Sequence, residues 1–106
     1  MAPRVRFSPE ARRDLFALYD YIARDSGPAR AMGYIERIED YCLGFADAPE
    51  RGTRRDDIRP GLRTVGFERR VLIAFDIGSA DVTIDRILYG GRDTARVLGR
   101  PRRTRR

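Results

Sequence analysis

The chain has 106 residues, of which 42% are apolar, and a formal net charge of +6 at pH 7. A chain of this length suits one domain around one core and leaves no room for a cofactor domain beside a substrate domain. Because no apolar run approaches the roughly 18 residues of a membrane span, and none follows the first arginines as in a secretory signal, we expect a cytoplasmic protein without a membrane partner.

A strand and a helix are predicted at the start of the chain. Val5 and Phe7 alternate with arginines, which is the period of a half-buried strand. Ser8 can accept a hydrogen bond from a free N–H at a helix start, Pro9 fits the first helical position, and Glu10 offsets the positive end of the helix dipole. The apolar residues that follow at helical spacing, and so form one stripe, are Ala11, Leu15, Leu18 and Ile22.

A second helix is predicted between the break at Gly27-Pro28 and Pro49. Its apolar stripe consists of Ala31, Ile35, Ile38, Cys42 and Phe45. Two matched stripes separated by a short break indicate an antiparallel helical hairpin. We expect Cys42, the single cysteine, to be a buried core residue. Without histidine or a second cysteine we expect no disulfide, no metal and no cofactor.

Three strands are predicted after the helices, at Leu62 to Phe67, Arg70 to Ile77 and Asp81 to Tyr89. The continuous apolar run from residue 71 to 75 indicates a strand inside the sheet, because both of its faces must be covered. Residues 78–80 supply the turn that follows it. The sequence therefore predicts an α+β fold, a helical hairpin packed on a small antiparallel sheet in the order β-α-α-β-β-β with a short C-terminal helix.

The positive charge is unevenly distributed along the chain. Residues 1–50 carry a net charge of −2, residues 51–70 carry +4, residues 71–99 carry −1, and residues 100–106 carry +5. This uneven distribution of charge argues against a DNA-binding surface that covers a whole face of the protein. We expect one domain over residues 1–99 and a basic tail that is disordered and solvated, with a phosphate-binding or partner-binding arm as the alternative for the tail.

Five motifs together give the chain a family resemblance. They are Ser8-Pro9-Glu10-Ala11, Asp14-Leu15 with Tyr21-Ile22-Ala23, Ile35 to Ile38, Arg59-Pro60-Gly61-Leu62-Arg63, and Arg86-Ile87-Leu88-Tyr89-Gly90-Gly91-Arg92-Asp93. In this order and spacing, over about Val5 to Leu98, the chain resembles the ParE branch of the RelE/ParE toxin superfamily. Each motif alone is weak, but the set is fairly specific.

This resemblance implies the toxin of a type II toxin-antitoxin pair, the kind of system associated with plasmid stabilisation. Its partner would be a small, acidic, DNA-binding antitoxin similar to ParD, and the toxin would reach operator DNA only through that antitoxin. ParE-like members poison DNA gyrase, whereas members related to RelE cut messenger RNA on the ribosome. Because both activities share one fold, the residues must decide between them.

The residues supply little proton chemistry for RNA cleavage. Attack by a ribose 2′-hydroxyl needs a proton acceptor, a proton donor and cations to hold the phosphate. The chain has no histidine, and free carboxylates and tyrosines titrate near about 4 and 10. By resemblance to the ribosome-dependent members, the phosphate-holding arginine falls on Arg92, but the tyrosine six residues later falls on Leu98. If the protein is a nuclease, the candidate catalytic residues are Arg92, Tyr89, Arg86 and Arg63.

We therefore expect a toxin that acts by binding gyrase, with the messenger-RNA endonuclease and a non-toxic protein that only binds its antitoxin as alternatives. The candidate target-binding residues are Arg59, Arg63, Arg69, Arg70, Arg86, Tyr89 and Arg92. The same arginines could instead form the solvated face of the sheet, paired with acids such as Asp76 and Asp85.

The residue pattern of the first helix also predicts a binding surface for the antitoxin. Phe16 points away from the apolar stripe, and Tyr19 and Tyr21 flank it, so the apolar surface is wider than one core needs. An amphipathic antitoxin helix could cover this surface while its acids meet the basic loop. The candidate antitoxin-binding residues are Phe16, Tyr19, Arg51, Arg54 and Arg55. Alternatively, Phe16 and Tyr19 simply lie on the surface.

Overall fold

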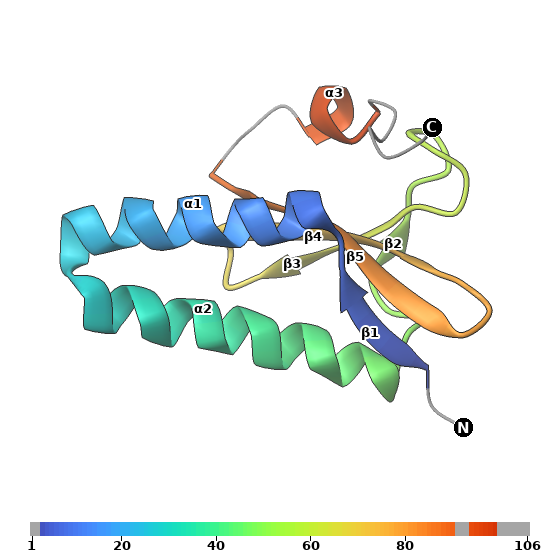
Figure 1. Ribbon diagram of the computed structural model, residues 1–106. Helices are drawn as coiled ribbons and strands as arrows, with labels where there is room; N and C mark the ends of the chain where they lie inside the picture. Colours follow the sequence, from blue (N-terminus) through green and yellow to red (C-terminus); the bar gives the residue numbers. More distant parts are fainter. Residues whose placement is uncertain (1–2, 91–93, 100–106) are drawn as a thin grey trace.

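Two long helices lie against one face of a five-stranded sheet (Figure 1). The computed structural model of the chain describes residues 3–90 and 94–99. Its elements are β1 (Arg4–Phe7), α1 (Pro9–Ser26), α2 (Pro28–Leu43), a single 3-10 turn η1 (Gly44–Ala46), β2 (Thr53–Arg54), β3 (Arg63–Phe67), β4 (Val71–Ile77), β5 (Asp81–Tyr89) and α3 (Thr94–Leu98). This order confirms the predicted α+β fold.

The sheet has the strand order β1-β5-β4-β3-β2. The pairings β2–β3, β3–β4 and β4–β5 are antiparallel, as expected for the three predicted strands, and β4 lies inside the sheet. β1, however, pairs parallel to β5, so the sheet is mixed. The sequence also gave no signal for β2, which is only two residues long. Pattern alone could not orient β1, because its partner strand comes more than 70 residues later in the chain.

The start of α1 joins the helix to the last strand. As expected, the side chain of Ser8 accepts a hydrogen bond of 2.9 Å from the N–H of Ala11, and Pro9 occupies the first turn. The Ser8 hydroxyl also donates to the carbonyl oxygen of Asp85 at 2.8 Å. At the other end of α1, Gly27 has φ of 95°, a backbone conformation that favours glycine, and α2 begins at the next residue.

The main core lies between the helical hairpin and the sheet. Its fully buried members include Ile38, Cys42 and Phe45 from α2 and η1, and Phe75 and Ile84 from the sheet. The stripes predicted for both helices face this core, and Cys42 is buried as expected.

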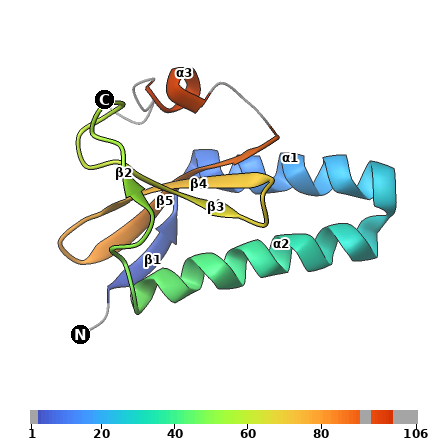
Figure 2. The same ribbon diagram turned by 180° about the vertical axis from the view of Figure 1, so that it is seen from behind.

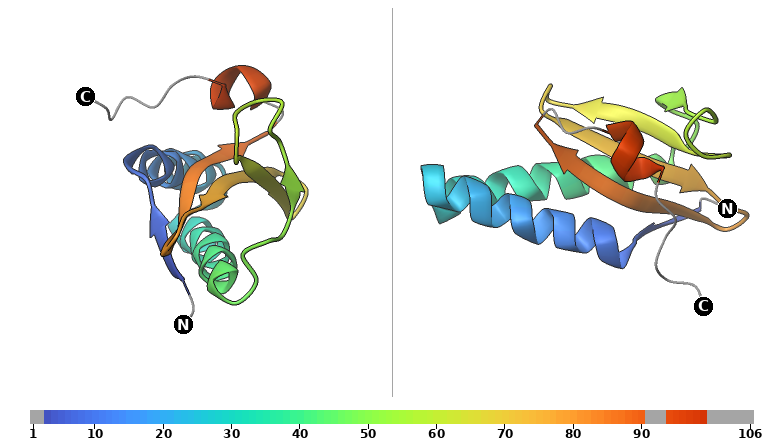
Figure 3. Two further views of the ribbon diagram at one scale, coloured as in Figure 1. Left: turned by 90° about the vertical axis from the view of Figure 1, so that its right-hand side faces the viewer. Right: turned by 90° about the horizontal axis from the view of Figure 1, so that it is seen from above.

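A smaller apolar cluster covers the opposite face of the sheet. It consists of Leu62, Ala74, Leu88 and Leu98, with Ile58 packed against it. Figure 3 shows the hairpin on one side of the sheet and α3, with the loop that follows β2, on the other. Coverage of both faces explains why residues 71–75 of β4 are a continuous apolar run.

The tip of the helical hairpin, where α1 meets α2, projects beyond the turn between β3 and β4. This overhang is visible from the front, from behind and from above (Figures 1, 2 and 3). It leaves the end of α1 and the start of α2 facing the ends of the strands.

Candidate functional site

Three of the arginines expected to face a target bind groups of the protein itself. Arg86 donates from Nε and Nη2 to the two carboxylate oxygens of Asp14, at 2.8 and 2.9 Å. This hydrogen bonding raises the pKa of the Arg86 guanidinium. Arg59 lies 3.3 Å from the buried Asp85 and 3.8 Å from Asp76. This is the pairing with sheet acids that was given as the alternative to target binding. These arginines hold elements of the fold together.

Arg63 is also occupied within the fold. Its Nε donates to the main-chain carbonyl of Arg51 at 3.0 Å, which ties β3 to the segment before β2. Arg63 is half-buried. It therefore presents less of its charge to a partner than a free surface arginine would.

The turn between β3 and β4 carries the two exposed arginines of the predicted set, Arg69 and Arg70. Glu68 and Arg69 have φ of 49° and 66°, so this tight turn uses left-handed backbone without a glycine. Within the described part of the chain, neither arginine has a carboxylate partner. Arg92, the remaining predicted arginine, lies outside the described residues.

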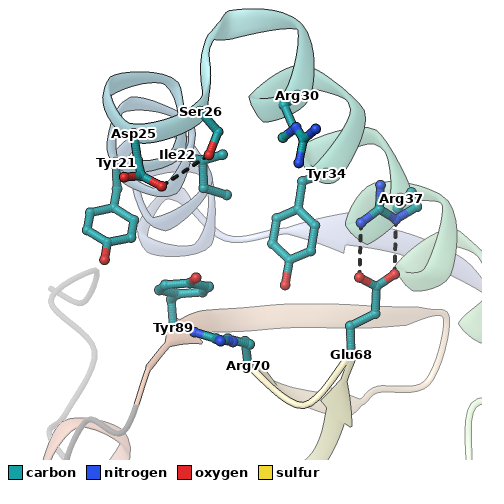
Figure 4. A pocket seen from close by; sticks show the side chains of 10 residues that line it. All are labelled: Tyr21, Ile22, Asp25, Ser26, Arg30, Tyr34, Arg37, Glu68, Arg70 and Tyr89. Atoms are coloured by element: carbon teal, nitrogen blue, oxygen red, sulfur yellow. Dashed lines mark hydrogen bonds and ion pairs between the residues drawn. The ribbon is translucent and has the colours of Figure 1, made fainter.

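Arg70 and the half-buried Tyr89 meet in a cavity of about 650 Å³ beneath the hairpin tip, which we call the tip pocket. Figure 4 shows side chains from α1 and α2 facing others from the β3–β4 turn and the end of β5. The pocket is lined by Tyr21, Ile22, Asp25, Ser26, Arg30, Tyr34, Arg37, Glu68, Arg70 and Tyr89. The structure thus brings together two residues of the predicted target surface with several that the sequence did not indicate.

Two side-chain pairs bound the tip pocket. The rings of Tyr21 and Tyr89 are tilted against each other with centroids 5.5 Å apart. Opposite them, Arg37 of α2 makes two hydrogen bonds of 3.0 Å to the carboxylate of Glu68, and its guanidinium lies 5.1 Å from the centre of the Tyr34 ring. The charged pair joins the hairpin to the β3–β4 turn.

The titration of these groups follows from their neighbours. The hydrogen bond from Arg37 lowers the pKa of Glu68. Burial raises the pKa of Tyr34, and the negative charge of Glu68 raises it further. Both shifts move the groups away from neutral pH, so neither side chain is set to exchange protons there.

The outer face of the hairpin carries a second hollow, of about 420 Å³, which we call the hairpin groove. It is lined by Arg12, Leu15, Phe16, Tyr19, Asp20, Met32, Ile35 and Glu39. Phe16 is 72% exposed, as its position off the stripe predicted, and Met32 is 46% exposed. Tyr19 is half-buried against the core. Met32 was not predicted from the sequence, although it also lies off the apolar stripe of its helix.

The basic loop expected to meet an antitoxin's acids is largely paired within itself. Arg54 lies 3.0 Å from Asp56, and Arg55 lies 2.9 Å from Asp57. Arg51 donates to the carbonyl of Ala48 at 2.8 Å and lies over the Phe45 ring at 4.7 Å. None of the three arginines lines the hairpin groove. Their contact with a partner remains a prediction.

In residues 3–90 and 94–99, no cluster of three or more histidine, cysteine, aspartate or glutamate side chains could hold a metal ion. None of the described helices is both long and apolar enough to cross a membrane.

The same architecture is seen in a solved structure described as the chromosomal ParDE TA system from P. aeruginosa. The two chains superpose with a TM-score of 0.74 at 24% sequence identity, over 84% of this chain and 97% of that one. The family model described as "ParE toxin of type II toxin-antitoxin system, parDE" matches residues 5–94. Toxin ParE3 of Caulobacter vibrioides is 31% identical over 87 residues, which are 82% of this chain and 86% of that protein. The chain therefore belongs to the ParE toxin family of type II toxin-antitoxin systems, which confirms the resemblance seen in its motifs.

Proposed function

We propose that this ParE-family toxin inhibits growth in the cytoplasm by binding and poisoning DNA gyrase, and that a small acidic antitoxin similar to ParD neutralises it. The observation that carries the gyrase proposal is the double hydrogen bond between Arg86 and Asp14. A nuclease needs cations that are free to hold a scissile phosphate, and this pair neutralises the arginine of the last strand inside the fold.

Other candidate groups support the same choice. Arg59 and Arg63 are also bonded within the protein, and the pKa of Tyr34 is moved further from neutrality. Poisoning an enzyme by binding requires no proton transfer from the toxin. The exposed side chains Arg69 and Arg70, together with Tyr89, are the proposed contacts with gyrase, and Arg92 stays in the proposed set from its motif.

The hairpin groove is the proposed antitoxin site. Phe16 and Met32 expose apolar surface on neighbouring helices, and charged residues of both signs flank them. An amphipathic helix that lays its apolar face into such a groove would cover this surface, which explains why both side chains lie outside the core. Salt bridges from the partner's acids to the basic loop would have to compete with the loop's own aspartates.

The gyrase proposal is tested with purified components and in cells. The purified toxin is expected to block supercoiling by gyrase and to trap cleaved DNA, and its induction is expected to trigger the DNA-damage response while messages stay intact. Arg70→Ala should weaken this inhibition more than Asp47→Ala, a change at an exposed residue away from the β3–β4 turn. Messages cut on ribosomes with supercoiling unaffected would favour the endonuclease alternative and reject the proposal, and harmless induction would favour a protein that only binds its antitoxin.

A further inference from the structure

The tip pocket contains hydrogen-bond donors that the described part of the protein leaves unused. Arg30 and Arg70 line it from opposite walls, and neither has a carboxylate partner among the described residues. The hydroxyl groups of Tyr21, Tyr34 and Tyr89 likewise make no hydrogen bond to any described residue. The side chains of Tyr34, Arg70 and Tyr89 border the same space (Figure 4).

The acids of the pocket do not cancel this excess of donors. Glu68 is neutralised by its two hydrogen bonds with Arg37. Asp25, at the rim, accepts a hydrogen bond of 3.1 Å from Ser26 and keeps its charge, so the three arginines and two acids of the lining leave one excess positive charge.

Arg30 and Arg70, which have no carboxylate partner among the described residues, therefore give the site its positive character. Arg70 lies next to the Tyr89 ring, and the hydroxyl end of Tyr34 points toward the same region (Figure 4). A guanidinium group next to phenol hydroxyls suits the oxygens of a phosphate group.

The aromatic rings of the tip pocket favour a ligand that contains a planar, unsaturated group. Three of the five tyrosines of the chain line this one cavity. The Tyr21 ring is 56% exposed, and in the close-up the rings of Tyr34 and Tyr89 both border the open space (Figure 4). Planar bases stack on such rings and on arginine guanidinium groups, whereas a simple anion gains nothing from them.

The shape of the pocket favours a small ligand over an extended chain. The Tyr21–Tyr89 pair bounds one side, and the ion pair between Arg37 and Glu68 bounds the other (Figure 4). A volume of about 650 Å³ lies within the range of about 300 to 1,000 Å³ typical of small-molecule sites. We propose that the tip pocket binds a nucleoside phosphate, with the base against the tyrosine rings and the phosphate at Arg70, beside Tyr89.

This site is separate from the hairpin groove and does not depend on gyrase as the target. Calorimetric titration of the purified chain with AMP, adenosine and inorganic phosphate tests it. AMP should bind at least about tenfold more tightly than either of its parts, because only AMP engages both the rings and Arg70. Equal binding of AMP and inorganic phosphate would overturn the proposal, as would the absence of binding by AMP.

Neighbouring arginines supply a matched pair of variants. Arg70→Gln should weaken AMP binding about tenfold, since it removes a charge-assisted contact with the phosphate. Arg69→Gln removes an exposed arginine from the same turn that does not line the pocket, so it should leave the affinity within about twofold. Equal losses in the two variants would mean that only the overall charge matters, and would reject the site.

Two further measurements address the rings and the source of the ligand. Tyr34→Phe keeps the ring packed near Phe67, 6.2 Å between centroids, and removes only the hydroxyl, so the fold is retained while AMP affinity falls a few fold. Resonances of the tyrosine rings should shift on adding AMP, and unchanged ring resonances would contradict the proposed placement of the base. A 5′-phosphorylated trinucleotide that displaces AMP would identify the end of a nucleic-acid strand as the source, and failure to displace would identify a free nucleotide.

Discussion

At the residue scale, Asp14 makes more specific contacts than any side chain singled out from the sequence. β1 pairs with β5 only over residues 81–84, so beyond that point no strand among the described residues lies along the β1 side of β5. The carboxylate of Asp14 accepts a hydrogen bond of 2.8 Å from the N–H of Ile87 and two more from Arg86. One side chain of α1 thus takes the place of a missing strand neighbour and neutralises an arginine.

Replacing Asp14 should reveal both roles. Asp14→Ala leaves a partly buried N–H and a partly buried guanidinium without partners, and we expect a loss of about 2 to 3 kcal/mol in the free energy of unfolding, measured by urea denaturation. Asp14→Asn keeps an acceptor for Ile87 but loses the charge, and it should cost about half as much. Asp20→Ala, at an exposed site on the same helix, is the control and should change stability by less than about 0.5 kcal/mol. A cost for Asp14→Ala no larger than this control would refute the assignment.

The reactivity of the Cys42 thiol tests whether this part of the core is closed to solvent. Burial raises the pKa of its thiol to about 12, so the folded protein holds almost no reactive thiolate at pH 8. Alkylation by iodoacetamide should proceed only through unfolding, and much more slowly than in urea. Rapid labelling of the native protein would show that the helix does not bury this residue.

The same shift predicts a dependence of stability on pH. Because the folded-state pKa lies above the unfolded value of about 8.5, the contribution to stability is complete below about pH 8.5 and decreases as the pH rises toward 12. Thermal melts of the wild type and of Cys42→Ala should therefore differ most at neutral pH and converge as the pH rises. A constant difference in melting temperature up to pH 11 would contradict this linkage.

Features of single residues could be predicted from the sequence where they depend on residues nearby in the chain. Ser8 at the start of α1 and the exposure of Phe16 both follow from the spacing of a few neighbouring residues. The pairing of Asp14 with Arg86 joins residues 72 positions apart. No local pattern contains that information.

At the element scale, the turn between β3 and β4 combines an unusual backbone with a link to α2. Glu68 and Arg69 both adopt positive φ, and Glu68 uses its carboxylate to bind Arg37. Left-handed backbone disfavours residues that carry a Cβ, so the turn is held by its surroundings rather than by its own preference.

Glycine at position 69 should relieve this unfavourable backbone. We expect Arg69→Gly to raise the free energy of unfolding by about 0.5 kcal/mol, since the gain from removing Cβ slightly exceeds the added entropy of the unfolded chain. Arg70→Gly, beside it and without positive φ, should instead destabilise the protein. Urea denaturation of both variants measures the effect, and destabilisation by both would mean that the left-handed backbone carries no cost.

The helices and the three long strands were predictable because the helical period of 3.6 and the short apolar runs of the strands are both patterns of consecutive residues. β2 has only two residues, which is too short for any period. The parallel pairing of β1 with β5 depends on the path of the whole intervening chain, and the pattern of β1 gave only its half-buried character.

At the scale of the whole molecule, the helical hairpin presents two different surfaces. Its outer face carries the apolar hairpin groove, and its tip overhangs the sheet to form the tip pocket. Arg70 and Tyr89 were predicted as part of a functional surface, and the structure places them in the same pocket. The opposing wall from the helices was not predicted, because helical spacing shows only that Arg30 and Tyr34 lie off the core stripe and not what they face.

The hairpin groove leads to a prediction about neutralisation. Because Phe16 is 72% exposed, Phe16→Asp should leave the folded toxin intact while weakening binding of the antitoxin by more than about tenfold, measured by calorimetry with the cognate antitoxin. Leu43→Asp is the control, since Leu43 is 52% exposed on α2 but does not line the groove. Antitoxin affinity that is unchanged in Phe16→Asp would place the antitoxin on another surface.

The position of β5 has a consequence for the order in which a newly made chain becomes active. β1 finds its partner in β5, and Asp14 finds both of its partners there. During synthesis, the first quarter of the polypeptide must therefore wait until residue 89 has left the ribosome before it can complete its contacts. A ribosome that stalls before that point would release only an unfinished and harmless product.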